Sequence, residues 1–353
     1  MLPLEIPSAA ILTSALASFL IAGTLVLAAR RYTVLAMDVP GAIQKFHSRP
    51  TPRIGGIGIY LALLAASQFA PDPDTGRILA TILVAGIPAL FMGLLEDITR
   101  RVGVSMRLAA TIASGVLACW VGGVTVTHLD IPFVDVLLHA APVALLFTSF
   151  AVGGVANAFN IIDGFHGLAS GTATLCLLAL GLIASLVGDT ALALTAMVVA
   201  AAVIGFWLVN FPWGRLFLGD GGAYFAGFAL AWLAVLLPMR NAEVSPWASF
   251  LICAYPVIEV LYSIVRRRQR SESPGAPDRR HLHSLVATRI VQRRLPRLDP
   301  TLQNAAVSVI MWCCAAVPAV VAVFFHDRTG VLACCALACV AAYHFIYRRV
   351  ART

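Results

Sequence analysis

Charge is scarce in this chain. Charged residues make up 12% of the 353-residue sequence, about half of the ~25% typical of soluble domains. This shortage argues against a water-soluble globular protein. The eight cysteines all fall in apolar stretches without metal-ligand spacing, so we expect them to be small hydrophobic side chains inside helices.

Three further features are missing, and each argues against a class of protein or segment. The chain has no internal repeat of the kind that builds the inverted halves of a secondary transporter. Its basic segments lack interleaved aromatic residues, which argues against nucleic-acid binding. The first apolar run has no basic segment before it, so we expect a membrane span rather than a cleaved signal peptide.

Long apolar runs are abundant instead. Hydrophobic residues make up 60% of the chain, and a helix needs roughly 20 apolar residues to cross the hydrocarbon core of a membrane. We predict an all-α integral membrane protein, a single domain over residues 1–353. Its eleven transmembrane helices are expected at 9–29, 54–69, 78–95, 105–121, 133–150, 167–187, 190–209, 221–238, 247–265, 306–325 and 331–347.

The basic residues indicate the orientation, because cytoplasmic loops carry the excess of Lys and Arg. If every run spans, 22 of the 25 Lys and Arg residues lie on one side and three on the other. We therefore predict an external N-terminus and a cytoplasmic C-terminus. The net charge of +8 follows from the same bias, and the cytoplasmic loops are expected at 30–53, 96–104, 151–166, 210–220 and 266–305.

Nearly every polar motif suited to catalysis falls in those loops, so we predict an active site on the cytoplasmic face. The acidic members are Glu96, Asp97, Asp163 and Asp220. Carboxylates at a membrane boundary are costly unless they face a polar cavity or bind a cation. Scattered oxygen ligands with room for water and phosphate suit Mg²⁺, with Mn²⁺ as a substitute. The plainer alternative is that these carboxylates cap helices or pair with neighbouring arginines.

Glycines and basic residues flank the carboxylates. The glycine pairs at 55–56 and 221–222 would let backbone amides approach a phosphate, and tight helix packing is the alternative. The donors available for a pyrophosphate are Lys45, Arg279, His281 and His283. Carboxylates, a metal and two basic loops at a membrane surface indicate phosphoryl transfer to or from a lipid.

Five motifs between Asp38 and His283 resemble those of the polyprenyl-phosphate N-acetylhexosamine-1-phosphate transferases, a group of glycosyltransferase family 4. They are Asp-x-Pro with His-x-x-Pro-Thr-Pro-Arg-x-Gly-Gly at 38–56, the acidic pair at 96–97, Asn-x-x-Asn-x-x-Asp-Gly at 157–164, Asn-Phe-Pro with Phe-Leu-Gly-Asp at 210–220, and Pro-Asp-x-x-His-x-His at 277–283. The resemblance implies transfer of a sugar 1-phosphate from a UDP-sugar to undecaprenyl phosphate, with release of UMP. It also implies a homodimer in the bacterial cytoplasmic (inner) membrane.

The resemblance assigns roles motif by motif. The metal ligands would be Asp220, Asn160 and Asp97. Catalytic roles would fall to Asp97, Glu96, Asp163, His281 and His283. Substrate would be bound by Lys45, Arg107, Asn210, Phe217, His166 and Arg279. Within these sets, Phe217 would stack on uracil, and Asp97 would position or deprotonate the lipid phosphate.

The sequence departs from the family pattern at three positions. Glu96 stands where the family usually has aspartate, His166 replaces the second aspartate of Asp-Gly-x-Asp-Gly, and Ser284 replaces the last histidine of His-x-His-His. We expect His166 near the uracil or as a local hydrogen-bonding group. The differences favour the branch that starts O-antigen and other surface polysaccharides over the peptidoglycan branch, and they leave the donor sugar open.

Two other functions fit part of the pattern. A transporter or flippase of a phosphorylated lipid or nucleotide-sugar would need polar groups within its spans, where Glu259 is the charge that stands out. A catalytically inactive relative is supported only by the histidine at position 166.

Overall fold

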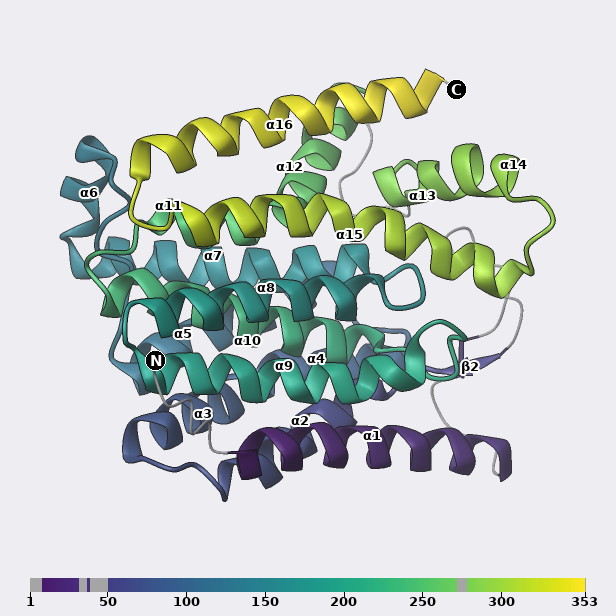
Figure 1. Ribbon diagram of the computed structural model, residues 1–353, viewed down its shortest axis with the longest axis horizontal. Helices are drawn as coiled ribbons and strands as arrows, with labels where there is room; N and C mark the ends of the chain where they lie inside the picture. The colour runs from purple at the N-terminus through teal and green to yellow at the C-terminus, as the bar shows by residue number, and fades with distance from the viewer. Residues whose placement is uncertain (1–7, 32–36, 39–49, 272–277, 353) are drawn as a thin grey trace.

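The computed structural model describes residues 8–31, 37–38, 50–271 and 278–352. In this part of the chain the regular structure is helical apart from one antiparallel pair, β1 (Met37–Asp38) and β2 (Thr51–Pro52). The all-α fold predicted from the sequence is confirmed (Figure 1). The helices are α1 (Ser8–Arg31), α2 (Gly55–Ser67), α3 (Pro73–Ala85), α4 (Ile87–Thr99), α5 (Val104–Gly122), α6 (Pro132–Leu138), α7 (Ala141–Ile162), α8 (Leu168–Leu186), α9 (Thr190–Asn210), α10 (Gly219–Arg240), α11 (Pro246–Ile252), α12 (Ala254–Arg268), α13 (Leu282–Val286), the π-helix η1 (Ala287–Val291), α14 (Gln292–Arg294), α15 (Pro300–Phe324) and α16 (Thr329–Arg352).

The long helices have the length and composition of membrane spans. Within the described residues, nine helical segments are long and apolar enough to cross a membrane, with α3 and α4 together forming one of them. The pair α11 and α12, bent by 75°, would make a tenth. Helix α2 has 13 residues, about 20 Å at 1.5 Å per residue, which is short for a ~30 Å core. The fold is that of a multi-pass membrane protein, while the count of eleven spans and the orientation stay predictions.

The predicted span at 133–150 is wrong in its position. The short helix α6 ends at Leu138, and the long helix α7 starts at Ala141. Pro142 lies in the first turn of α7, where its missing N–H leaves no hydrogen bond unmade, whereas in the middle of a helix it would break the ladder. As a result, the segment 151–166, predicted to be a loop, is helical through Ile162.

The predicted loop 266–305 is also helical in part. Helix α12 continues to Arg268, the short elements α13, η1 and α14 follow the histidine motif, and α15 begins at Pro300. The histidines therefore lie at the start of a helix rather than in an extended charged run.

Helix α10 lies at the centre of the bundle (Figure 1). All of its residues from Gly219 to Pro238 are buried, and it packs against α4, α7 and α2. Its aromatic side chains Phe225, Phe228 and Trp232 are fully buried. Because lipid is as apolar as these side chains, helices in a membrane are held together by close packing more than by hydrophobic burial.

Glycines permit the closest of these helix contacts. A Cβ atom on Gly56 would collide with the backbone of Gly222, and a Cβ atom on Gly93 would collide with the backbone of Gly221. Helices α2 and α4 can therefore approach the first turn of α10 only because these positions carry no side chain.

The amides of the first glycine pair are also occupied. Gly55 and Gly56 donate their backbone N–H groups to the carbonyls of Phe217 and Leu218 at 3.0 and 3.1 Å. These glycines close the loop before α10, so helix packing and loop closure, rather than phosphate binding, explain them.

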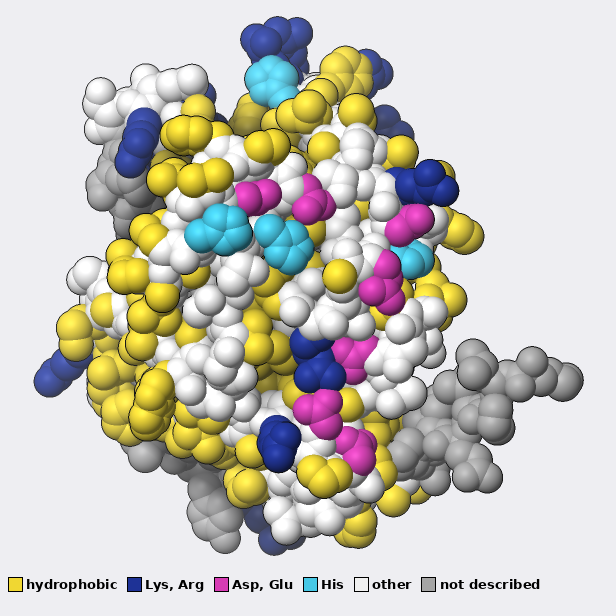
Figure 2. Space-filling view, turned by 90° about the vertical axis from the view of Figure 1, so that its left-hand side faces the viewer, with side chains coloured by type: hydrophobic (Ala, Val, Ile, Leu, Met, Phe, Trp, Pro, Cys, Tyr) yellow, Lys and Arg dark blue, Asp and Glu magenta, His cyan; other side chains and the backbone are white. Residues whose placement is uncertain are grey.

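The polar loops collect at the two ends of the bundle. One end, at the right of Figure 1, carries β2, α13 and α14. The opposite end faces the viewer in Figure 2, where acidic and imidazole side chains lie between apolar flanks. Arg240, the last residue of α10, donates to Asp189 and Asp74, each at 2.7 Å. This ion pair ties α10 to the starts of α9 and α3.

Candidate active site

Asp97 joins the last turn of α4 to the first turn of α10. Its Oδ1 accepts the backbone N–H of Asp220 and its Oδ2 accepts that of Gly221, each at 3.0 Å. The Asp97 side chain is fully buried. The first amides of a helix have no partner within the helix, so Asp97 supplies the acceptors that α10 needs. Two of the predicted metal ligands therefore meet.

Two guanidinium groups neutralise this acidic pair. Nη2 of Arg53 lies 2.9 Å from Oδ1 of Asp220 and 3.3 Å from Oδ1 of Asp97. Arg107, from α5, donates to the other carboxylate oxygen of Asp220. One cationic nitrogen is thus within reach of both carboxylates, as a bound metal ion would have to be.

Asn160 lies on α7 and faces α10. Its Oδ1 accepts the hydroxyl of Tyr224 at 3.2 Å. Tyr224 follows Asp220 by four residues, so the two side chains share one face of α10. Asn157 instead donates to Thr111 at 2.7 Å and packs α7 against α5. Of the two motif asparagines, Asn160 is the one directed toward the helix that carries Asp220.

Asp163 terminates α7 and belongs to the same charged cluster. Burial raises the pKa of its carboxyl to about 7; the Arg53 guanidinium opposes this rise, and the charges of Asp220 and Asp97 add to it. A group that ionises near neutral pH is suited to exchanging protons with a substrate.

The donor set fits magnesium better than zinc. Among the residues that the structure describes, no three or more His, Cys, Asp and Glu side chains are arranged to hold a metal ion. Structural and catalytic zinc sites need three or four such ligands. Mg²⁺ is commonly held by one or two carboxylates, with waters and substrate phosphates completing its shell. Asp97, Asp220 and the amide of Asn160 fit that description.

Asn210 fastens the loop before α10 to the turn after α7. Its Oδ1 accepts the backbone N–H of Gly167 at 2.6 Å, and its Nδ2 donates to the carbonyl of Leu216 at 2.7 Å. The side chain is buried. Both ends of the amide are thus engaged with the backbone, which gives Asn210 a structural role, while its contact with the nucleotide stays a prediction.

His166 also links these loops through hydrogen bonds. Its backbone N–H donates to Asn304 at 2.7 Å, and its Nδ1 lies 2.9 Å from the carbonyl oxygen of Pro212. The side chain is buried, which fits a local hydrogen-bonding group better than a ligand of uracil. The ring of Phe217 lies 5.8 Å from it, centroid to centroid, and is partly exposed. Phe217 also donates its N–H to Pro52, next to Arg53.

Glu96 closes the turn between α4 and α5. Its Oε2 accepts the backbone N–H of Val102 at 2.8 Å. This contact shapes the connection that leads to Arg107, so one oxygen of Glu96 is committed to structure. Glutamate, which is unusual at this position of the family motif, thus supplies the acceptor for this amide.

The histidine motif lies against the turn between α7 and α8. The rings of Phe165 and His283 meet edge to face at 5.6 Å, and the rings of His281 and His283 stack at 5.3 Å. Burial lowers the pKa of His283 to about 4, although the nearby carboxylate of Glu259 opposes this change. His283 is therefore neutral at pH 7. Arg279, two residues before His281, is exposed.

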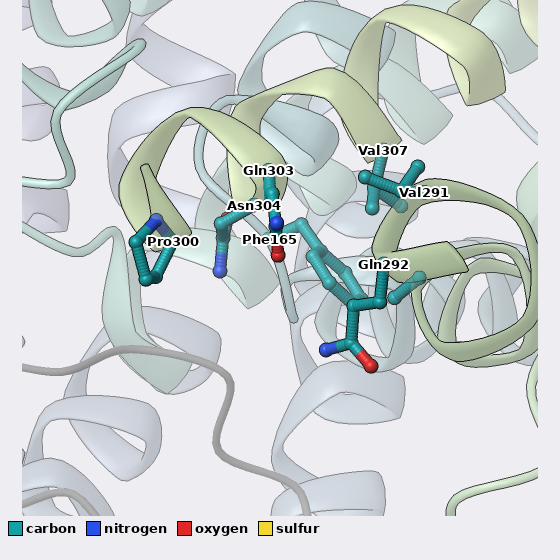
Figure 3. Close-up of a pocket in the computed structure, with 8 residues that line it drawn as sticks. Phe165, Val291, Gln292, Pro300, Gln303, Asn304 and Val307 are labelled. Carbon is teal, nitrogen blue, oxygen red and sulfur yellow. The ribbon is translucent and has the colours of Figure 1, made fainter. Parts of the chain in front are cut away.

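A small cavity adjoins the same turn (Figure 3). Its volume is about 60 Å³, enough for water but far below the roughly 300–1,000 Å³ of ligand pockets. It is lined by Phe165, Ala287, Val291, Gln292, Pro300, Gln303, Asn304 and Val307. The cavity therefore does not serve as the substrate site.

The structure also shows what sequence reasoning missed. Lys45 lies outside the described residues. Arg53 lies in the first motif, at 38–56, and nothing in the sequence indicated that it bridges two carboxylates. Tyr224 was overlooked, although its spacing of one helical turn from Asp220 was a usable signal. Glu259, next to the histidines, was noted only as an unusual charge in an apolar run.

The fold and the site together define a class of protein. It is a polytopic helical membrane protein with a site of carboxylates and arginines at one end of its helix bundle. The model of glycosyl transferase family 4 matches residues 79–238. The chain is 30% identical over 254 residues, 69% of this chain and 67% of its relative, to the undecaprenyl-phosphate alpha-N-acetylglucosaminyl 1-phosphate transferase of Yersinia pestis.

Two further relatives bear the same kind of name. The enzyme of that name from Escherichia coli strain K12 is 29% identical over 261 residues, 71% of this chain and 68% of the relative. A probable undecaprenyl-phosphate N-acetylglucosaminyl 1-phosphate transferase of Bacillus subtilis strain 168 is 27% identical over 250 residues, 70% and 68% of the two chains. The chain belongs to glycosyl transferase family 4, among the polyprenyl-phosphate N-acetylhexosamine-1-phosphate transferases, as its motifs predicted.

Proposed function

We propose that this protein transfers an N-acetylhexosamine 1-phosphate from a UDP-sugar to undecaprenyl phosphate, releasing UMP, at the cytoplasmic membrane of a bacterium. The observation that carries the proposal is the meeting of Asp97 and Asp220 with Arg53 and Arg107 at one end of the bundle. The names of the relatives support the lipid acceptor. The motifs favour a first step of O-antigen or other surface-polysaccharide synthesis, and the homodimer stays a prediction.

In this reaction an oxygen of the lipid phosphate bonds to the β-phosphorus of the UDP-sugar. The bond from that phosphorus to the bridging oxygen breaks, and UMP leaves with the electron pair. Asp97, Asp220 and Asn160 would hold Mg²⁺, which when bound neutralises charge on the diphosphate. Arg53 and Arg107 then exchange the carboxylates for phosphate oxygens, to which guanidinium groups bind strongly.

The remaining residues position the substrates or exchange protons. Asp163, whose pKa is about 7, accepts a proton from the lipid phosphate. We assign this task to Asp163 rather than to Asp97, because each oxygen of Asp97 accepts an amide of α10 and its remaining lone pairs are assigned to the metal ion. The partly exposed ring of Phe217 stacks on uracil, and His281 and His283 contact the sugar or the pyrophosphate.

The test is a transfer assay with membranes, undecaprenyl phosphate and a panel of radiolabelled UDP-N-acetyl sugars. Labelled lipid should form with at least one donor and should disappear when EDTA removes divalent cations. Asp220→Asn should lower transfer at least roughly 100-fold, whereas Asp327→Asn, at an exposed position of the opposite end, should not. A transporter or an inactive relative would form no labelled lipid with any donor.

A further inference from the structure

Glu259 is a buried ionisable residue to which the transfer reaction, as proposed, gives no task. It lies in α12, just after the 75° bend from α11, and only 1% of its surface is exposed. A carboxylate among apolar helices is costly unless it is paired and hydrogen-bonded. Its partners should therefore indicate what it does.

Those partners come from the histidine loop, residues 278–283. Oε1 of Glu259 accepts the backbone N–H of Leu282 at 3.1 Å and lies 3.0 Å from Nδ1 of His281. Oε2 lies 4.0 Å from Nδ1 of His283. Among the described residues, neither Oε2 nor that Nδ1 has a hydrogen-bond partner, although both are buried. A single carboxylate thus faces both imidazole rings.

Other contacts already fix the backbone of this loop. Asp278 pairs with Arg266 of α12 and accepts the backbone N–H of Arg280 at 2.9 Å. From α16, the hydroxyl of Tyr347 donates to the carbonyl of Arg280 at 3.0 Å. Since these contacts anchor the loop, what Glu259 adds is the orientation of the two rings that follow.

Nε2 of His283, the ring nitrogen turned away from Glu259, points toward the site. A Cβ atom placed on Gly164 would lie 3.8 Å from Nε2 of His283, and Gly164 directly follows Asp163. The Nδ1 of His283 faces the carboxylate of Glu259. The ring therefore lies between Glu259 on one side and the turn that carries Asp163 on the other.

We propose that Glu259 is the positioning residue of the imidazole pair. By accepting from Nδ1 of His281 it selects the Nδ1–H tautomer and fixes the plane of that ring, the usual task of a carboxylate behind a functional histidine, while Nε2 of the same ring lies 3.7 Å from Oδ2 of Asp278. By facing Nδ1 of His283 it keeps Nε2 of that ring toward Gly164. The inference rests on the proposed function, in which these histidines contact the sugar or the pyrophosphate of the donor.

The test compares Glu259→Ala and Glu259→Gln with a control, Leu261→Ala, whose side chain is exposed on the same helix. The first measurement is acylation of His281 and His283 by diethyl pyrocarbonate, followed by mass spectrometry, with the exposed His139 as internal reference. Glu259→Ala should raise the acylation of both rings several-fold. Glu259→Gln keeps an acceptor oxygen in the same place, so its acylation should lie between wild type and alanine.

The second measurement is transfer kinetics. Glu259→Ala should lower kcat about 10- to 100-fold, as loss of a group behind a functional histidine does, with the KM for the UDP-sugar within about threefold. Glu259→Gln should recover part of kcat. The proposal would be overturned if Glu259→Ala and Leu261→Ala showed the same histidine acylation and the same kcat. It would also be overturned if kcat fell as far in Glu259→Gln as in Glu259→Ala.

The two proposals fail in different ways. If wild-type protein forms no labelled lipid, the proposed function fails, while histidine acylation still tests the role of Glu259. If Glu259→Ala does not fold, the nearly isosteric Glu259→Gln decides, because unchanged acylation and unchanged kcat in that variant would then overturn the inference.

Discussion

The backbone N–H of Asp220 lies 3.0 Å from the carboxylate of Asp97, 123 residues earlier in the chain. This contact places the acidic end of α4 against the N-terminus of α10, where the helix dipole favours negative charge. Capping a helix and pairing with arginine were the plainer alternatives to a metal site, and the structure shows both. The capping contact also positions Asp220 beside Arg53 and Arg107. The structural role of Asp97 and its proposed role in the active site therefore coincide.

The contact depends on glycine at position 93. In Gly93→Ala the new Cβ would collide with the backbone of Gly221, which forces α4 away from α10. We expect a loss of about 1–3 kcal/mol of stability and a matching loss of transfer. Gly154→Ala is the control, because nothing lies within 4 Å of a Cβ there. Thermal unfolding in detergent measures the difference, and equal midpoints for the two variants would contradict the packing argument.

Arg53 should compete with a divalent cation for the carboxylates. Its guanidinium lies within 3.3 Å of both. Arg53→Gln should therefore strengthen Mn²⁺ binding to the substrate-free protein at least about tenfold, because a unit charge about 4 Å away at an effective dielectric of ~20 is worth about 4 kcal/mol and ~1.4 kcal/mol is already tenfold. Electron paramagnetic resonance of free Mn²⁺ measures this affinity. Arg215→Gln removes an exposed arginine that lies over the Trp213 ring. Should Arg53→Gln bind Mn²⁺ no better than this control, the competition is absent.

Phe217 should contribute to donor binding and not to lipid binding. Stacking of a base on an aromatic ring is worth roughly 1–3 kcal/mol, so Phe217→Leu should raise the KM for the UDP-sugar at least about fivefold. The KM for undecaprenyl phosphate should stay unchanged. Phe217→Tyr keeps the ring and should resemble wild type. An unchanged donor KM in the leucine variant would exclude stacking.

His283 should make stability depend on pH. Its pKa falls from 6.5 in the unfolded chain to about 4 in the folded protein, so the folded state binds fewer protons between these values. Stability is then lost as the pH falls from about 6.5 toward 4, by up to about 3 kcal/mol. His283→Gln cannot take up this proton and should show a flatter profile. Unfolding midpoints at pH 4.5 and pH 7.5 test the sign, and an equal fall in both proteins would contradict it.

Sequence reasoning predicted most helices because the length and composition of an apolar run are local properties. It misplaced the span at 133–150 because the apolar run continues through these residues, whereas the helix is interrupted between Leu138 and Ala141. The bend between α11 and α12 was also invisible, since the composition of 247–265 does not change where the helix breaks.

Within the site, the motifs identified segments that meet in the structure, but they did not indicate which contacts their residues make there. Asn210 and His166 carry motif positions, yet both are buried and hold loops together. A motif records that a residue type is needed and not whether it touches a substrate or the backbone. Arg53 shows the reverse case, because a basic residue in a basic loop gives no sign that it will bridge two carboxylates.

The amino-acid sequence by itself determined that this protein is helical, embedded in a membrane and a member of a phosphosugar transferase family, because run lengths and motif residues can be read along the chain. Only the tertiary structure decided which oxygens meet which cations. Asp97, Arg53 and Asp220 come from three separate segments, and their side chains converge because glycines let α2 and α4 approach α10 closely. Such convergence depends on helix packing, which no local pattern records.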